Sequence, residues 1–206
     1  MVSVTTKRRS AGRVRVRKMC AIALMSAVIA VCAWITIPLP AISFTMQIFG
    51  VAAALTILGG CDGTIAIAVY LMLGLAGVPV FSGFRGGVGV LTNATGGYIV
   101  GFLLMGLLYR LLEKRGGNGA VRRMVSLLAG LAVCYAFGTA WFAVMFAGGR
   151  SVWAILSLCV FPFIVPDVLK IVLACVVGVA IRRSGVMNAL SEEVSDTVTR
   201  DGGRRQ

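Results

Sequence analysis

Residues 151–181 read SVWAILSLCVFPFIVPDVLKIVLACVVGVAI, an apolar run that decides the fold. As one helix with a rise of about 1.5 Å per residue, the run would measure about 46 Å, well beyond a hydrocarbon core of roughly 30 Å. Pro162 and Pro166 interrupt it, and proline lacks the N–H that a continuous helix needs. We therefore predict a short helix that lies outside or re-enters the membrane, a break, and a spanning helix from about Pro166. Because irregular backbone at membrane depth is tolerated only against protein or a cavity, the break is a candidate functional region.

The same apolar character extends along the whole chain of 206 residues. Hydrophobic residues make up 59% of it and charged residues 13%, whereas a soluble domain carries about 25% charged residues. The mean hydropathy is +0.96. This composition excludes a soluble enzyme, a disordered chain and a secreted disulfide domain, and it predicts an all-α, polytopic membrane protein.

We expect six membrane-spanning helices, whose ends are marked by prolines, glycines and basic segments. A signal peptide is the alternative for the first span, but its apolar region exceeds the usual stretch of about 7–15 residues. The membrane domain covers 19–183, between a basic tail at 1–18 and a polar tail at 184–206. The expected spans are 19–37, 42–58, 64–81, 96–112, 125–147 and a last one from about Pro166.

The basic residues indicate the orientation. Of 20 Lys and Arg residues, 7 lie in 7–18, 5 in 110–123 and 5 in 182–205. Such clusters stay on the cytoplasmic side, and six crossings with a cytoplasmic N-terminus place all three there, whereas five or seven do not. We predict a plasma-membrane protein with both termini in the cytoplasm. The net charge of +13 therefore indicates topology, and we expect no nucleic-acid binding.

Several chemistries are absent from the sequence. The chain has no histidine, and its six cysteines are scattered and never form a C-x-x-C pair. Histidine is the commonest general base and transition-metal ligand. With no paired carboxylates and no nucleophile–base spacing, we expect no enzyme, no metal site and no cofactor.

Two charges lie within the last expected span, in PDVLK at 166–170. A charge inside a span is costly and is a functional hypothesis by default. Asp167 and Lys170 are three residues apart, so on a helix they share a face. They form either a structural ion pair or polar contacts to a ligand. We expect Asp167 in the first turn after a proline, where the helix dipole favours an anion.

Other polar residues gather at the expected outer ends of the spans. A lone polar side chain in a span often only joins helices, but polar groups that converge in a largely apolar hollow bind small ligands. We predict that they form one outward site with the charged pair. These candidates are Gln47, Arg85, Asn93 and Tyr98.

Small residues recur four apart on two expected spans. Ala23 and Ala27 lie on the first, and Gly97 and Gly101 on the fourth. Such spacing lets helix backbones approach closely. We expect the glycines to meet a helix of the same chain, whereas the alanines are free to face a separate membrane subunit.

Four motifs, in order, resemble the BioY family, the biotin-binding S components of energy-coupling factor (ECF) vitamin transporters. They are IPLP…FTMQ (37–47), VYLMLGLAGVPVFSG (69–83), GGVGVL…TGGYIVGF (86–102) and DVLK (167–170). The resemblance covers about residues 19–181. One departure is NATGGY at 93–98, where the family usually has GPTGGY.

The resemblance implies a six-helix protein that binds biotin near the outer face. Its partners would be a transmembrane coupling protein and two ATP-binding-cassette ATPases. Asp167 would accept the ureido N–H groups, with Asn93 or Gln47 at the ureido carbonyl. Lys170 or Arg85 would pair with the tail carboxylate. Further matches are Tyr98, at the Tyr of TGGY, and Ala23 and Ala27, which resemble the A-x-x-x-A contact with the coupling protein.

Two alternatives remain open within this resemblance. The chain is either the binding subunit of an ATP-driven importer or a self-sufficient biotin carrier, the latter as a homo-oligomer. An S component for another vitamin on the same fold is the third possibility.

Overall fold

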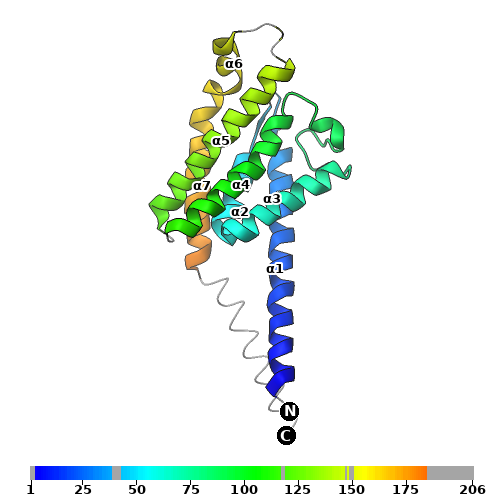
Figure 1. The fold of residues 1–206 in the computed structure, drawn as a ribbon, viewed down its shortest axis with the longest axis vertical. Coiled ribbons are helices and arrows are strands. Elements are labelled where there is room, and N and C mark those ends of the chain that lie inside the picture. The colour runs from blue at the N-terminus through cyan, green and yellow to red at the C-terminus, as the bar shows by residue number, and fades with distance from the viewer. Residues whose placement is uncertain (1–2, 39–42, 117–118, 147, 149–150, 185–206) are drawn as a thin grey trace.

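The computed structural model describes residues 3–38, 43–116, 119–146, 148 and 151–184 (Figure 1). The described residues are mostly helical, which confirms the predicted all-α class; the exceptions are one small hairpin and the connecting segments. The elements in chain order are α1 (Ser3–Trp34), β1 (Thr36–Ile37), β2 (Phe44–Thr45), α2 (Gln47–Leu58), α3 (Gly60–Leu75), the 3₁₀ turn η1 (Val88–Val90), α4 (Gly96–Gly116), α5 (Ala120–Phe146), α6 (Val152–Cys159) and α7 (Phe161–Arg183).

Four helices of the described part are long and apolar enough to cross a membrane. They are the segments Val16–Trp34, Gly96–Arg115, Ala120–Phe146 and Phe161–Arg182. The apolar helices α2 and α3 have 12 and 16 residues, fewer than the roughly 20 that a full crossing needs. The predicted number of six spans is therefore not established by helix length. Residues 3–18, expected as a tail, continue α1 as helix and project beyond the bundle (Figure 1).

The core is arranged around α2. This helix packs against α1, α3 and α7, and most of its residues are buried, including Val51, Ala52, Ala54 and Leu55. The small alanine side chains allow three helices to approach it. The short α2 is therefore surrounded by protein along most of its length.

A hairpin replaces the expected ends of the first two spans. The first helix ends at Trp34 rather than at residue 37, and Thr36 and Ile37 pair with Thr45 and Phe44 in an antiparallel ladder. The β-branched residues favour extended backbone, and the proline at position 38 disfavours helix in the residue before it. The hairpin brings Thr45 to the start of α2.

The third helix also differs from the expected span at 64–81. Gly59, with φ of 86°, alone separates α2 from α3, so Asp62 lies in the first turn of α3 and pairs with Lys18 at 2.8 Å. The helix ends at Leu75, just before Gly77 with φ of 99°. The chain then forms an irregular segment at 78–91, hereafter the cavity loop.

The last apolar run is broken, as predicted, but at Val160 rather than at Pro166. The residue has φ of −124° and ψ of −57°, and α7 starts directly after it. Pro162 lies in the first turn, where no N–H is needed, and Pro166 lies inside the helix. The expectation that Asp167 sits in a first turn is therefore wrong, and the dipole of α7 contributes little to it, because that field acts over the first turn.

The glycines of α4 meet a helix of the same chain, as expected. A Cβ on Gly101 would lie 2.8 Å from the sulfur of Cys134, and one on Gly97 would lie 3.1 Å from Cα of Gly138 and collide with Trp141 Cβ. All three neighbours belong to α5. Because glycine has no side chain, α4 packs closely against α5 at these two positions.

We predict that Gly97→Ala destabilises the protein by about 1–3 kcal/mol, because the new methyl group overpacks a rigid helix contact. Trp141 Cβ is attached to backbone and cannot rotate away. The matched control is Gly89→Ala, whose Cβ would have no atom within 4 Å. Thermal unfolding of the purified variants tests this, and equal midpoints for both variants would contradict it.

Candidate functional site

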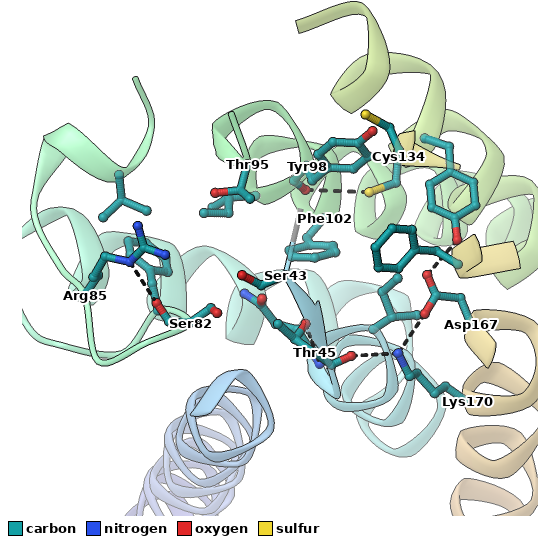
Figure 2. A pocket seen from close by; sticks show the side chains of 18 residues that line it. Ser43, Thr45, Ser82, Arg85, Thr95, Tyr98, Phe102, Cys134, Asp167 and Lys170 are labelled. Carbon is teal, nitrogen blue, oxygen red and sulfur yellow. Dashed lines mark hydrogen bonds and ion pairs between the residues drawn. The ribbon is translucent and has the colours of Figure 1, made fainter. Parts of the chain in front are cut away.

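A cavity that is partly open to solvent lies between the hairpin, the cavity loop and helices α2, α4, α5, α6 and α7 (Figure 2). Together with the solvent space at its mouth it measures about 760 Å³. The lining is formed by Ser43, Thr45, Gln47, Ile48, Phe81, Ser82, Arg85, Val90, Thr95, Tyr98, Ile99, Phe102, Cys134, Tyr135, Cys159, Phe163, Asp167 and Lys170.

The charged pair of α7 lines this cavity and is almost completely buried. Asp167 and Lys170 are 2% and 5% exposed, and Lys170 Nζ lies 2.8 Å from Asp167 Oδ1. The geometry is therefore compatible with both interpretations, a structural ion pair and polar contacts to a ligand, because the two residues bind each other and also line the cavity. A buried pair is costly to break, because the remaining charge loses its partner.

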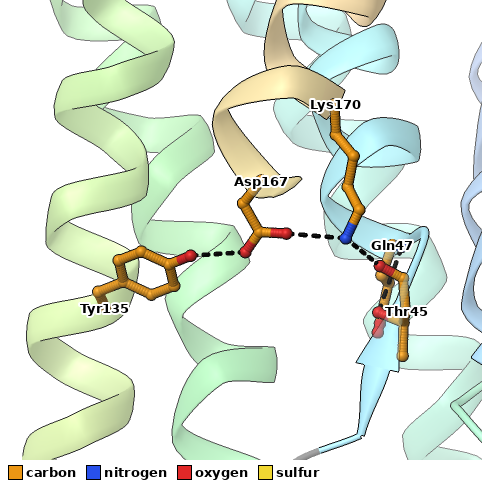
Figure 3. Close-up of polar contacts among 5 residues, drawn as sticks. All are labelled: Thr45, Gln47, Tyr135, Asp167 and Lys170. Carbon is orange, nitrogen blue, oxygen red and sulfur yellow. Dashed lines mark hydrogen bonds and ion pairs between the residues drawn. The ribbon is translucent and has the colours of Figure 1, made fainter. Parts of the chain in front are cut away.

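Two further contacts hold the pair in place (Figure 3). Tyr135 of α5 donates its hydroxyl to Asp167 Oδ2 at 2.6 Å. Lys170 Nζ donates to the backbone oxygen of Thr45 at 2.7 Å and lies 3.6 Å from the centre of the Phe44 ring. Each carboxylate oxygen accepts one bond and has a second lone pair, and two of the three ammonium N–H groups are used. The pair therefore offers both acceptor and donor capacity to a ligand.

Two predicted polar residues line other walls. Gln47, at the start of α2, is 5% exposed and donates its amide to the hydroxyl of Tyr70 at 2.5 Å. Tyr98, in the first turn of α4, is 8% exposed, and its hydroxyl lies 2.9 Å from that of Thr139. Both side chains are thus held by a hydrogen bond to a neighbouring helix.

The last two predicted residues differ in their placement. Arg85 is exposed at the cavity wall, where its Nε donates to the backbone oxygen of Ser82 at 3.3 Å. Asn93 is exposed and is not among the lining residues, and its backbone oxygen accepts the indole N–H of Trp141. Five of the six predicted site residues therefore share the cavity, and Asn93 lies outside it.

Tyr135 is the residue that sequence reasoning missed. It lies in an apolar stretch of α5 and belongs to none of the four motifs. A signal was present, because a tyrosine within a span needs a partner for its hydroxyl. The backbone oxygen of Thr45 could not be found in this way, because every residue has a backbone oxygen.

The expected partner-contact residues lie on the uncovered side of the first helix. Ala23 and Ala27 are exposed, whereas Met25 and Ile29 on the opposite side of α1 are buried. The alanine stripe is therefore uncovered in the monomer.

Comparisons with known proteins agree on one family. The sequence model of the BioY family matches residues 5–186. The biotin transporter BioY of Thermotoga maritima is 36% identical over 160 residues, which cover 78% of this chain and 92% of the relative. The probable biotin transporter BioY of Pyrococcus horikoshii is 37% identical over 157 residues, covering 76% and 91%.

A solved structure gives the same result at the level of fold. The crystal structure of the S-component for biotin from an ECF-type ABC transporter superposes with a TM-score of 0.74 and 25% identity, over 83% of this chain and 93% of that one. With a family match over most of its length and relatives of this identity, the chain belongs to the BioY family.

Proposed function

We propose that this multi-pass membrane protein binds biotin and imports it as the S component of an ECF-type transporter. The observation that carries the proposal is the Asp167–Lys170 pair, which is buried, oriented by Tyr135 and Thr45, and set in the wall of a cavity with both polar and apolar lining. Biotin as the ligand is supported by relatives that are named biotin transporters and by the structural match to an S-component for biotin.

The polar ends of biotin suit the two ends of the cavity. The ureido ring has two N–H donors and one carbonyl acceptor, and Asp167 is the acceptor for the donors. Because Asn93 lies outside the cavity, Gln47 is the residue for the ureido carbonyl. Lys170 is already bound to Asp167 and Thr45, so exposed Arg85 is the better partner for the tail carboxylate. The ring then lies deep in the cavity and the tail points to the opening.

Apolar walls complete the site. Phe81, Ile99, Phe102 and Phe163 surround the polar groups, and burial of hydrocarbon against such side chains is favourable by about 25 cal/mol per Å². They suit the sulfur-containing ring and the alkyl tail of biotin. Charge-assisted hydrogen bonds to the buried pair are the strong contacts.

The membrane arrangement follows from helix packing and charge. We propose six crossings, with α2 and α3 as short, largely protein-covered spans and both termini in the cytoplasm, where the three basic clusters lie. The cavity residues lie near the C-terminal end of α1 and the N-terminal halves of α4 and α7. The site then faces outward.

The proposed partners are a transmembrane coupling protein and two ATP-binding-cassette ATPases. The exposed stripe of Ala23 and Ala27 on α1 is the proposed contact with the coupling protein, since small residues allow a partner helix to approach closely. The motor of transport would then reside in the partners.

We predict that Asp167→Asn and Lys170→Ala each weaken biotin binding by about 10- to 100-fold. The first removes the charge that accepts the ureido N–H groups, and the second removes the charge-assisted bond that holds Asp167. Isothermal titration of the purified chain with biotin measures it. The matched control is Asp62→Asn, which removes the surface ion pair with Lys18 by the same chemical change.

Size-exclusion profiles report whether the variants are folded. The double variant Asp167→Asn with Lys170→Met leaves no lone buried charge, so it stays folded if the single variants do not. Wild-type affinity in all three variants would remove the pair from the site.

Tyr135→Phe removes only the hydroxyl that orients Asp167. We expect affinity for biotin to fall by about tenfold, the typical effect of one hydrogen bond to a charged group. The matched control is Tyr109→Phe, because the buried hydroxyl of Tyr109 has no hydrogen-bond partner among the described residues. Equal affinities of the two variants for biotin would show that Tyr135 does not orient the site.

Ala27→Leu tests the partner assignment. The larger side chain blocks close helix packing, so we expect loss of most biotin uptake in cells that supply the coupling protein and ATPases, with unchanged biotin affinity of the purified chain. Ala154→Leu, at an exposed position on α6, is the control. Uptake by the wild-type chain in cells without any coupling module would instead favour a self-sufficient carrier.

A further inference from the structure

The cavity loop forms one wall of the site but is anchored to two different helices. It contributes Phe81, Ser82, Arg85 and Val90 to the lining. At its base, the N–H of Gly87 donates to the backbone oxygen of Gly74 at 2.7 Å, which ties the loop to the end of α3. Its tip, residues 81–85, lies against the end of α1.

Trp34, the last residue of α1, makes the main contact to this tip. Its indole ring stacks on the ring of Phe84, with centroids 5.0 Å apart and planes inclined by 28°. The indole N–H also donates to the backbone oxygen of Pro79 at 2.9 Å. Stacked aromatic pairs are attractive beyond the area that they bury, so one side chain holds the loop at two points.

A third contact comes from the residue that starts the hairpin. The hydroxyl of Thr36 lies 3.1 Å from that of Ser82, which itself lines the cavity. The end of α1 and the start of the hairpin therefore touch the loop at three places that lie on both sides of Phe81. Together these contacts determine where the tip stands relative to the cavity.

The backbone at the tip of the loop has a strained conformation that these contacts stabilise. Phe84 has φ of 56°, a left-handed conformation that is rare for a bulky side chain. The N–H of Phe81 donates to the oxygen of Arg85, closing a tight turn in which Gly83 also has positive φ. Such strain persists only where surrounding contacts hold the backbone in place. Phe84 is 63% exposed, and its one ring contact among the described residues is the stack on Trp34. The turn directs Phe84 to Trp34 and the next residue, Arg85, to the cavity.

We propose that Trp34 is a positioning residue that holds the cavity loop in place as one wall of the site, so that release of its contacts limits how fast ligand enters and leaves. The proposal rests on the proposed function in taking biotin as the ligand. Because Trp34 is not among the lining residues, it acts through the loop and makes no contact with the ligand. Loss of the contact between Trp34 and the loop therefore raises the rate constants of both association and dissociation. The equilibrium affinity, which is their ratio, changes much less.

The test measures association and dissociation of radiolabelled biotin with the purified full chain in detergent. For Trp34→Ala we expect both rate constants to rise by about tenfold, the effect of one aromatic pair and one hydrogen bond. Trp34→Phe keeps a ring for the stack but loses the N–H donor, so we expect a smaller rise. Phe84→Ala combined with Trp34→Ala adds little to Trp34→Ala alone, since Trp34→Ala already removes the stack.

The control is Trp153→Ala, which removes an exposed indole on α6 that pairs with Phe161 and lies outside the cavity lining. A general loss of folding stability lowers affinity without faster association, and this result would overturn the proposal. Rates for Trp34→Ala equal to those of Trp153→Ala would also overturn it. If the wild-type chain binds no biotin, the proposed function itself fails, and the two failures are thereby distinguished.

Discussion

The buried ion pair between Asp167 and Lys170 is the interaction on which the site depends. Neither charge has enough water around it to remain alone, because removing one partner from a buried pair leaves an uncompensated charge at a cost of about 3–5 kcal/mol. Their mutual attraction is supported by the Tyr135 hydroxyl and the Thr45 carbonyl. These contacts come from α5, α7 and the hairpin. The pair therefore joins three separate parts of the chain and sets their arrangement at the polar end of the cavity. A ligand that binds there meets charges already in position.

Close packing of small residues provides the frame that holds these parts. The alanines of α2 and the glycines of α4 let their neighbours approach, and this packing carries the ends of α1, α4 and α7 to the cavity. Sequence reasoning located the long helices well, because an apolar block of about 20 residues has few alternatives in a membrane. It placed the helix ends less well. The hairpin, the early end of α3 and the break at Val160 depend on φ and ψ at single residues such as Gly59, Gly77 and Val160, and hydropathy contains no information about them.

The same distinction separates the predicted from the unpredicted parts of the site. Charge within an apolar span is a strong signal, so Asp167 and Lys170 were found from their cost alone. Gln47, Arg85 and Tyr98 were found because polar groups are scarce in such a sequence. Asn93 was placed with them by its position near Tyr98, but the turn before α4 leaves it exposed. Tyr135 and the Thr45 carbonyl were missed. A tyrosine in an apolar helix is easily taken for a packing residue, and a sequence motif specifies side chains rather than backbone oxygens.

The first helix connects two surfaces that have no evident relation in the sequence. Its exposed stripe runs through Ala23, Ala27 and Val31 to Trp34, at spacings of three to four residues that keep all four on one side of the helix. The stripe begins at the small residues suited to a partner helix and ends at the indole that stacks on Phe84. The opposite side of α1 is packed into the bundle through Met25, Ile29 and Ala33. The helix α1 therefore carries both surfaces, since its exposed side holds the stripe proposed for a partner and its last residue contacts the cavity loop.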